Sequence, residues 1–295
     1  EHIDKYFLNR NISWNPKFGF QRPPCLKWNE YKDKESGEKV SMIVAAASMP
    51  GDTSPKAVQR LFIDTDTHTK TGAAMKGSME GRAVHLYRKE SQETLFIGEG
   101  IENVLSAIKA MQIQGKQKIG GAAALSASLV PSIVLPEENH TCYILVDSDP
   151  PPKKKNAAGF AGQKASMALA KRLEEEGRTA YLVTPDDTCF SDDPKKLDFN
   201  DLLKGDTNGL SIYERIQRGV QVSEVEWDPE QAIERILEGK GEKKKKKDQG
   251  ADDPDAVEYQ LEQLNKTYAT VLMGSKFRII REYYDDVVKR HTISF

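Results

Sequence analysis

The sequence predicts an α/β protein in which a parallel sheet with helical crossovers follows a small α+β subdomain. Short apolar runs without polar alternation are typical of strands that are buried on both faces. In the middle of the chain such runs alternate with helical patterns, which is the order that a parallel sheet requires. The expected strands are Leu95–Ile97, Ala122–Leu125, Tyr143–Val146 and Tyr181–Val183.

Two amphipathic patterns predict the crossover helices. Apolar residues recur at helical spacing from Val104 to Met111 and again from Ala165 to Leu173. Gly177 follows the second pattern and is a candidate for the left-handed residue that ends a helix. A short helix is expected between the second and third strands. In such a sheet, ligands gather at the carboxyl ends of the strands.

The flanks of this region carry weaker signals. Leu61–Asp64 and Ala83–Tyr87 are expected strands of the small subdomain, separated by a stretch rich in Gly, Thr and Lys. Residues 239–255 join a lysine run to an acidic segment and are expected to be a disordered linker. Beyond the linker, residues 257–268 predict a helix, and we expect a hairpin around Gly274.

Composition limits the class of protein. Of the 295 residues, 38% are hydrophobic and 30% are charged, and no apolar run reaches the roughly 18 residues of a membrane span. Three distant cysteines indicate neither a disulfide framework nor a zinc knuckle, so a reducing cytoplasm is expected. With a net charge of −2, any nucleic-acid binding has to come from local basic patches. The chain begins without Met or an apolar signal segment, so we expect a fragment of a longer protein.

Carboxylates follow two of the expected strands directly. Glu99 stands between two glycines after the first strand, and Asp147 and Asp149 follow the third. Asp198 and Asp201 come after the last strand and are expected to return to the same edge. Because hard divalent cations prefer oxygen ligands, this edge is a candidate metal site for phosphoryl transfer. Taken singly, each element has a structural alternative, since Asp-x-Asp after a strand is commonly a turn or a helix cap.

Three motifs together resemble the Toprim domain of bacterial primases, topoisomerases and some nucleases. They are Gly98-Glu99-Gly100-Ile101-Glu102-Asn103, then Val146-Asp147-Ser148-Asp149, then Asp198-Phe199-Asn200-Asp201-Leu202. The last motif is similar to that of the Toprim primases of phages and plasmids. Fainter similarities lie upstream, in residues 6–12 and 81–84, and downstream, where residues 264–276 look like the opening of the helicase-linked part of phage primase–helicases.

The resemblance implies a division of the chain into four parts. These are an N-terminal primase-core subdomain over 1–91, a Toprim catalytic domain over 92–206, a helical segment and basic disordered linker over 207–255, and the truncated start of a helicase-associated module over 256–295. It further implies a zinc-binding template reader before residue 1 and a helicase after residue 295. The implied partners are single-stranded DNA and nucleoside triphosphates, in the cytoplasm of a bacterial host cell and without a membrane.

The resemblance also implies roles for the acidic residues. Glu99 would be the general acid/base or a metal-organising carboxylate, and Asp147 and Asp149 would hold Mg²⁺ or Mn²⁺. Glu102 would either support these groups from behind or be an exposed acid that the helix dipole favours in the first turn. The implied metal set is Glu99, Asp147, Asp149, Asp198 and Asp201.

Basic residues supply the candidate contacts to nucleotide or DNA. After Asp149 this chain departs from its relatives, because three prolines and three lysines replace an immediate turn towards a glycine and a helix. The lysines would grip a triphosphate or the template backbone, or this segment is only a solvated surface loop. The candidates are Lys70, Lys76, Arg82, Lys153, Lys154, Lys155 and Lys164.

The sequence therefore predicts a DNA primase core that polymerises ribonucleotides on single-stranded DNA by two-metal phosphoryl transfer. One alternative is a Toprim nuclease, which would use the same carboxylates to cleave a phosphodiester. The other is a non-catalytic module that binds DNA or a replisome partner. A measurement of divalent-metal binding would distinguish either enzyme from a degenerate, non-catalytic module. A topoisomerase is not expected, because no stretch resembles the tyrosine-bearing domain of those enzymes.

Overall fold

The computed structural model of the chain describes residues 1–16, 20–87, 94–116, 119–152 and 159–237. The chain divides into two compact units, Glu1–Leu237 and Glu238–Phe295, and the described residues belong to the first. The predicted linker over 239–255 and the predicted module over 256–295 lie outside the described residues.

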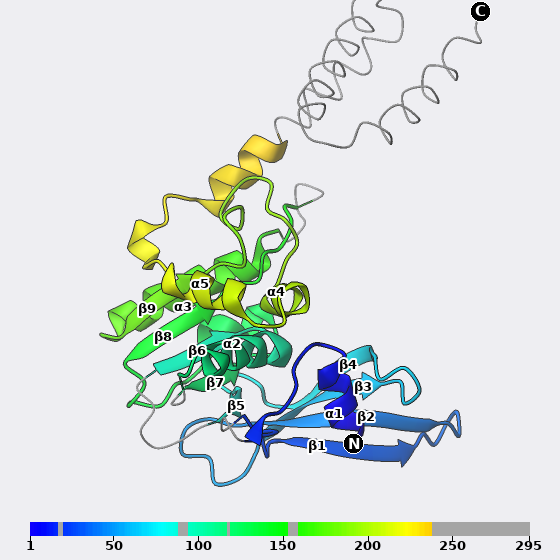
Figure 1. The fold of residues 1–295 in the computed structure, drawn as a ribbon. Coiled ribbons are helices and arrows are strands. Elements are labelled where there is room, and N and C mark those ends of the chain that lie inside the picture. The colour runs from blue at the N-terminus through cyan, green and yellow to red at the C-terminus, as the bar shows by residue number, and fades with distance from the viewer. Residues whose placement is uncertain (17–19, 88–93, 117–118, 153–158, 238–295) are drawn as a thin grey trace, which may run out of the picture. The chain divides into compact units, whose positions relative to one another are not determined.

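The N-terminal part is a four-stranded antiparallel sheet with one helix against it (Figure 1). The strands follow one another in chain order, and strand β2 pairs with both β1 and β3. The elements are α1 (His2–Leu8), β1 (Leu26–Lys32), β2 (Lys39–Ala47), β3 (Ala57–Ile63) and β4 (Lys70–Gly77).

Alternation along the strands decides which side of this sheet is buried. Leu26 pairs with Ala45, and Ile43, two residues before Ala45 on the same strand, pairs with Leu61. Leu26, Ile43 and Leu61 therefore face the same side of the sheet, and all three are buried in the main core. Strand β4 replaces the Gly/Thr/Lys-rich stretch that was predicted only to separate two strands. It lies at the edge of the sheet and is largely exposed, so its sequence has no apolar period that reveals a strand.

The second sheet confirms the predicted fold class of a parallel α/β protein. Strands β6, β7, β8 and β9 pair in parallel, in the order β7-β6-β8-β9. Strand β5 adds to the β7 edge in the antiparallel direction, so the predicted strand over 83–87 belongs to this sheet and not to the N-terminal one. The strands are β5 (Val84–Leu86), β6 (Thr94–Gly98), β7 (Gly120–Ala123), β8 (Thr141–Leu145) and β9 (Thr179–Val183).

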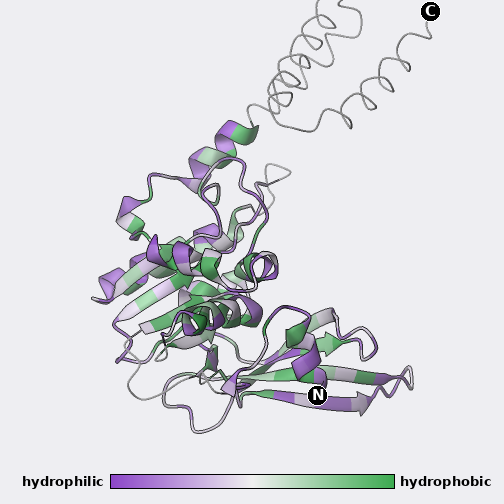
Figure 2. Cartoon of the chain, in the orientation of Figure 1, coloured by the Kyte–Doolittle hydropathy of each residue, from purple (hydrophilic) through white to green (hydrophobic). Residues whose placement is uncertain are grey.

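Helices cover both faces of this sheet. Helix α2 packs in one core cluster with α4 and α5, and helix α3 packs in a second cluster with η2. The hydrophobic residues gather on the strands and on the inward faces of the helices (Figure 2). The elements are α2 (Ile101–Ile113), η2 (Ala127–Ser132), α3 (Ala161–Glu175), α4 (Phe199–Gly205), α5 (Leu210–Gln217) and η3 (Val222–Glu224), followed by a helical segment over 229–237.

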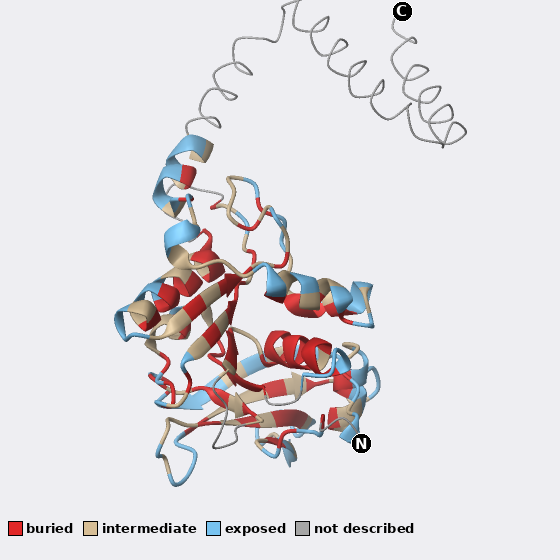
Figure 3. Ribbon diagram, turned by 60° about the vertical axis from the view of Figure 1, so that its left-hand side comes forward, coloured by how far each residue is buried: buried red, intermediate tan, exposed pale blue. Residues whose placement is uncertain are grey.

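Helix α2 is the central helix of the unit and is buried along nearly its whole length (Figure 3). It approaches the sheet closely at Gly121, where a Cβ atom would lie 2.3 Å from Cγ1 of Val104. Its other side meets the N-terminal part, since Lys109 donates a hydrogen bond to the carbonyl oxygen of Asn11. Only a helix that is apolar on several faces fits between these layers.

Candidate active site

Glu99 and the Asp147–Asp149 pair come from two neighbouring parallel strands. Strands β6 and β8 pair in register, with Ile97 opposite Ile144, so both strands end at the same edge of the sheet. The backbone around Glu99 is fixed by Leu125, whose N–H donates to the Glu99 carbonyl oxygen over 2.8 Å. Leu125 is therefore part of the loop that holds Glu99 and not the end of a strand as predicted.

The third acidic segment returns to this edge through a short backbone bridge. The N–H of Ser148 donates to the carbonyl oxygen of Leu197 over 3.1 Å, which places Asp198 beside the loop after β8. Asp198 is the N-cap of α4, and its carboxylate accepts the N–H of Asp201 over 2.8 Å. The Asp201 carboxylate itself is exposed and lies 3.3 Å from Nζ of Lys204, so it is neutralised on the surface.

The electrostatics of this edge distinguish Glu99, Asp147 and Asp198 from ordinary acids. Burial and then the charge of Asp149 raise the pKa of Glu99. Burial raises the pKa of Asp147 well above its ordinary value, and the charges of Glu99, Asp198 and Asp149 add to this effect. Burial also raises the pKa of Asp198. The fold therefore destabilises the ionised forms of these three carboxylates, and a bound cation would remove this destabilisation.

Asp149 is positioned by the start of helix α3. Its Oδ2 accepts the N–H of Gly162 over 2.8 Å, and its backbone exchanges two hydrogen bonds with the side chain of Gln163. A Cβ atom on Gly162 would lie 2.5 Å from the carbonyl oxygen of Asp147, so this close approach requires glycine. Gly162 and Gln163 were not predicted as site residues, because they follow the loop after Asp149 and carry no motif of their own.

Asp147 is held by a chain of side-chain hydrogen bonds that reaches the N-terminal part. Asn103 donates to Oδ1 of Asp147 over 2.7 Å and accepts the N–H of Asn200 over 3.2 Å. The Asn200 amide donates to the carbonyl oxygen of Arg10 and to Oγ of Ser106, and it accepts from the Arg10 guanidinium. Asn103 and Asn200 are buried and stand within the two acidic motifs, yet only their partners reveal this role.

Glu102 is neither an exposed first-turn acid nor a group that contacts the carboxylates in the structure. Its Oε1 accepts the hydroxyl of Tyr6 over 2.5 Å and lies 3.6 Å from Nζ of Lys70 and 3.9 Å from Nε of Arg10. Although burial pushes its pKa upward, the charges of Lys70 and Arg10 and the Tyr6 hydroxyl hold the pKa below its ordinary value. Glu102 therefore joins the N-terminal part to α2.

The predicted basic contacts are dispersed. Lys70 pairs with Glu102, Arg82 lies 3.5 Å from Asp52, and Lys164 lies 2.6 Å from Glu230, so each of these three already has an acidic partner. Lys76 is exposed on β4. Lys153, Lys154 and Lys155 lie outside the described residues.

The carboxylates suit a hard divalent cation by their donor chemistry. Within the described residues, no ion pair neutralises Glu99, Asp147, Asp149 or Asp198, although these four groups gather at one edge. In the described parts of the chain no three acidic, histidine or cysteine side chains enclose a position for an ion. The donors are therefore present and electrostatically uncompensated, while their side chains do not surround an ion.

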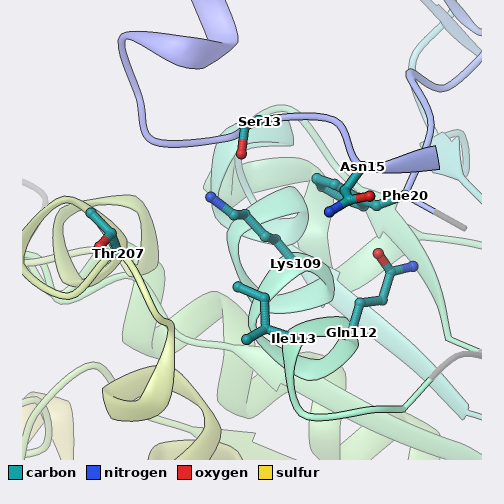
Figure 4. A pocket seen from close by; sticks show the side chains of 7 residues that line it. All are labelled: Ser13, Asn15, Phe20, Lys109, Gln112, Ile113 and Thr207. Carbon is teal, nitrogen blue, oxygen red and sulfur yellow. The ribbon is translucent and has the colours of Figure 1, made fainter. Parts of the chain in front are cut away.

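A separate cavity of about 300 Å³ lies near the other end of α2 (Figure 4). Lys109, Gln112 and Thr207 are among its lining residues, and none of the lining residues is acidic. Burial lowers the pKa of Lys109. Because the thirteen residues of α2 span about 20 Å, this cavity is distinct from the acidic edge at the beginning of the helix.

A parallel sheet with helices on both faces and acidic loops at the carboxyl ends of its strands defines an α/β domain. Residues 94–208 match the model of the Toprim domain family, so the chain contains a Toprim domain. A Toprim domain indicates a metal-dependent nucleic-acid enzyme or a nucleic-acid-binding module. No curated protein matches the chain. Among the described residues, no helix combines the length and the apolar character that a membrane span requires.

Proposed function

We propose that this chain is the core of a DNA primase, which polymerises ribonucleotides on single-stranded DNA with Mg²⁺ or Mn²⁺. The observation that supports it is the gathering of Glu99, Asp147, Asp149 and Asp198 at one edge of a Toprim sheet, where no cation of the described residues compensates their charge. Such an arrangement suits phosphoryl transfer, where catalysis is mostly positioning and charge stabilisation.

Each residue of the edge has a role in this proposal. Glu99 is the general acid/base, since a pKa raised by burial and by Asp149 lies closer to neutral pH, where proton transfer is most effective. Asp147, Asp149 and Asp198 are the proposed metal ligands, and Asp201 a weaker one because Lys204 pairs with it. When bound, the metal would stabilise negative charge on the attacking and leaving oxygens. Asn103 and Gly162 orient the ligands from the protein side.

The basic residues remain proposed contacts to nucleotide and template. Among the candidates in the described residues, Lys76 has no acidic partner there, and the lysines at 153–155 follow the proposed metal-binding loop in the sequence. Lys70, Arg82 and Lys164 would first have to leave Glu102, Asp52 and Glu230. A helicase module in the same full-length protein belongs to this proposal as well.

One reaction tests the proposal. The chain is incubated with single-stranded DNA, labelled nucleoside triphosphates and Mg²⁺ or Mn²⁺, and native protein is compared with Glu99→Gln and Asp147→Asn. We expect new oligonucleotides from the native chain and none from either variant. Glu137→Gln is the matched control, because Glu137 is an exposed carboxylate before the start of β8, at the opposite edge of the sheet.

The same reaction distinguishes the alternatives. Shortened DNA without nucleotide incorporation, lost in both variants, would identify a Toprim nuclease. No product together with no metal binding would indicate a non-catalytic module. Equal activity of the native chain and Asp147→Asn would contradict the proposed site.

A further inference from the structure

The N-terminal sheet has a second side that none of the core clusters includes. Cross-strand pairing places Lys27, Val44, Arg60 and Ala74 in one row on this side, and Phe62 stands in the next row. We call the side of the sheet that carries these residues the outer face. It is opposite to the side that buries Leu26, Ile43 and Leu61, because successive residues of a strand point to opposite sides.

The outer face is apolar and is partly open around Met42, which lies opposite Phe62 and is only 1% exposed. Val44, Val58 and Phe62 are partly exposed, and they neither belong to the core clusters of the described residues nor pack against them. Tyr31, at the end of β1 on the same side, is 41% exposed. A sheet that buries only one side normally carries polar residues on the other, so a half-exposed apolar side indicates a binding surface.

All charges on the strands of this face are positive. Lys27, Arg60 and Lys76 lie on it, and its strand positions include no Asp or Glu. None of these three cations forms an ion pair within the described residues. On the opposite side of the sheet, by contrast, Lys39 pairs with Glu30 over 2.8 Å. Uncompensated cations on an apolar surface favour a polyanion over an apolar peptide.

Two acids in the turns at the ends of the sheet are engaged locally. Asp33, in the turn between β1 and β2, accepts the N–H of Ser36 over 2.9 Å. Asp64, after β3, accepts the N–H of Thr67 over 2.7 Å. These hydrogen bonds belong to the turns themselves, so the acids are fixed at the ends of the sheet and do not pair with the cations of the outer face.

Aromatic and cationic groups are adjacent on this surface. The Arg60 guanidinium lies 5.8 Å from the centre of the Phe62 ring, and the Nε atom of Arg60 is buried without a hydrogen-bond partner in the described residues. Lys27 on β1 and Lys76 on β4 are separated by three strand spacings, about 14 Å across the sheet, and by two residues along the strands. Single-stranded nucleic acids are bound by cations that contact the phosphates and by aromatic rings that stack on the bases, and this surface carries both.

We propose that the outer face binds single-stranded nucleic acid, with Phe62 and Tyr31 stacking on bases and Lys27, Arg60 and Lys76 contacting phosphates. The inference deepens the proposed function, on which it rests for the identity of the strand as a DNA template. It places a template contact on a surface that does not include the acidic edge, so binding here requires no metal.

Binding is measured with the full chain and a fluorescent oligothymidylate by anisotropy, in EDTA so that the carboxylates do not contribute through a metal. The double variant Lys27→Gln/Lys76→Gln is compared with Lys32→Gln/Lys39→Gln, which removes the same charge from the opposite side of the same sheet. We expect the outer-face variant to weaken binding at least about fivefold and to lower the slope of log affinity against log salt by about 1.4. Phe62→Leu is expected to weaken binding at least about fivefold through lost stacking.

Three results would overturn the inference. These are unchanged affinity in the outer-face variant, an equal loss in both double variants, and tighter binding of duplex than of single-stranded DNA through the same residues. Thermal unfolding of each variant shows that the comparison is made on folded protein. If the native chain makes no primers but binds oligothymidylate through Lys27 and Lys76, the proposed function fails and this inference stands.

Discussion

Glu99 and Glu102 stand three residues apart at the start of α2, yet their surroundings are opposite. Glu102 is buried with a hydroxyl and two cations around it, and these partners hold its pKa low. Glu99 is less buried, faces Asp149 and has its pKa raised. Over three residues of sequence, the fold surrounds the Glu102 carboxylate with cations, while no cation of the described residues pairs with Glu99.

The difference separates structural from functional charge. At Glu102, the cations Arg10 and Lys70 come from the N-terminal part, so the ion pairs join that part to the Toprim domain. At Glu99, the neighbours Asp147 and Asp149 are also acidic, so the folded protein gains nothing from their proximity. A bound cation would relieve this repulsion, so Glu99, Asp147 and Asp149 are candidates for a functional site.

The largest expected effect is at Glu99. Glu99→Gln should lower primer synthesis by roughly 10²–10⁴-fold, the usual contribution of a general acid or base. The same variant should raise the melting temperature of the metal-free protein at neutral pH, because a raised pKa makes the ionised form unfavourable in the fold.

The sign of this pH dependence is testable by calorimetry in EDTA. A pKa raised above its ordinary 4.5 means that the native state binds more protons, so native stability falls as pH rises through that region. The advantage of Glu99→Gln should therefore disappear as pH is lowered towards 4.5 and below. A variant that melts lower than native protein at pH 7 would contradict the assignment of Glu99 as an uncompensated acid.

The second effect concerns Asn103, which orients Asp147. Asn103→Ala should reduce activity and metal affinity by about 10–100-fold, as expected for a residue that holds a metal ligand in place. Isothermal titration with Mn²⁺ separates this effect from a loss of folding. Gln114→Ala, at the exposed end of α2, is the control and should leave both quantities unchanged.

The third effect tests the compensated carboxylate. Glu102→Gln should lower the free energy of unfolding by about 2 kcal/mol, because a buried charge-assisted hydrogen bond is lost and two cations lose their partner. A double-mutant cycle with Tyr6→Phe measures the coupling of the pair. Since the pKa of Glu102 is lowered in the fold, its stabilisation is present above pH 4.5 and is lost as pH falls through the folded pKa. If the coupling between Tyr6 and Glu102 persists at a pH below the folded pKa of Glu102, the ionised carboxylate is not the form that stabilises the pair.

The smallest effect is expected for a surface pair. Lys164 and Glu230 approach within 2.6 Å, but their side chains are 34% and 74% exposed, so solvent screens the interaction. Lys164→Ala should change the free energy of unfolding by about 0.5 kcal/mol or less, and added salt should reduce the change further. A coupling larger than about 1 kcal/mol in a cycle with Glu230→Ala would show a more specific role for this pair.

Prediction from the sequence succeeded for the elements whose own residues carry a clear apolar pattern. The parallel strands and their crossover helices were found because buried runs and helical periods are local properties, and Gly177 ends α3 in the left-handed conformation as expected. Strands β1 and β2 were not predicted, and β4 was interpreted as a separator. Strands β1 and β4 are largely exposed, so their apolar signal is weak. Strand β2 was missed although residues 42–47 form a continuous apolar run.

The candidate site was predictable in part for the same reason. Glu99, Asp147 and Asp149 directly follow strands, and a residue at a strand end is placed by the sheet itself. Asn103, Asn200 and Gln163 were missed, because the contacts Asn103–Asp147, Asn200–Asn103 and Gln163–Asp149 span 44, 97 and 14 residues and depend on how the chain returns. Spacing in the sequence contains no signal for such contacts.

The sequence by itself determined the parallel sheet and the acids at its carboxyl edge, since strand period and strand ends are encoded within a few residues. The tertiary structure decided which acids are compensated, because Tyr6 and Arg10, which lie near the N-terminus, contact Glu102 only in the folded chain. It also decided that Lys76 lies on an outer face while Lys70 pairs with Glu102, since a register shift at Phe62 and Ile63 interrupts the alternation between them. Charge compensation is a property of distances in space, and distances between remote segments exist only after folding.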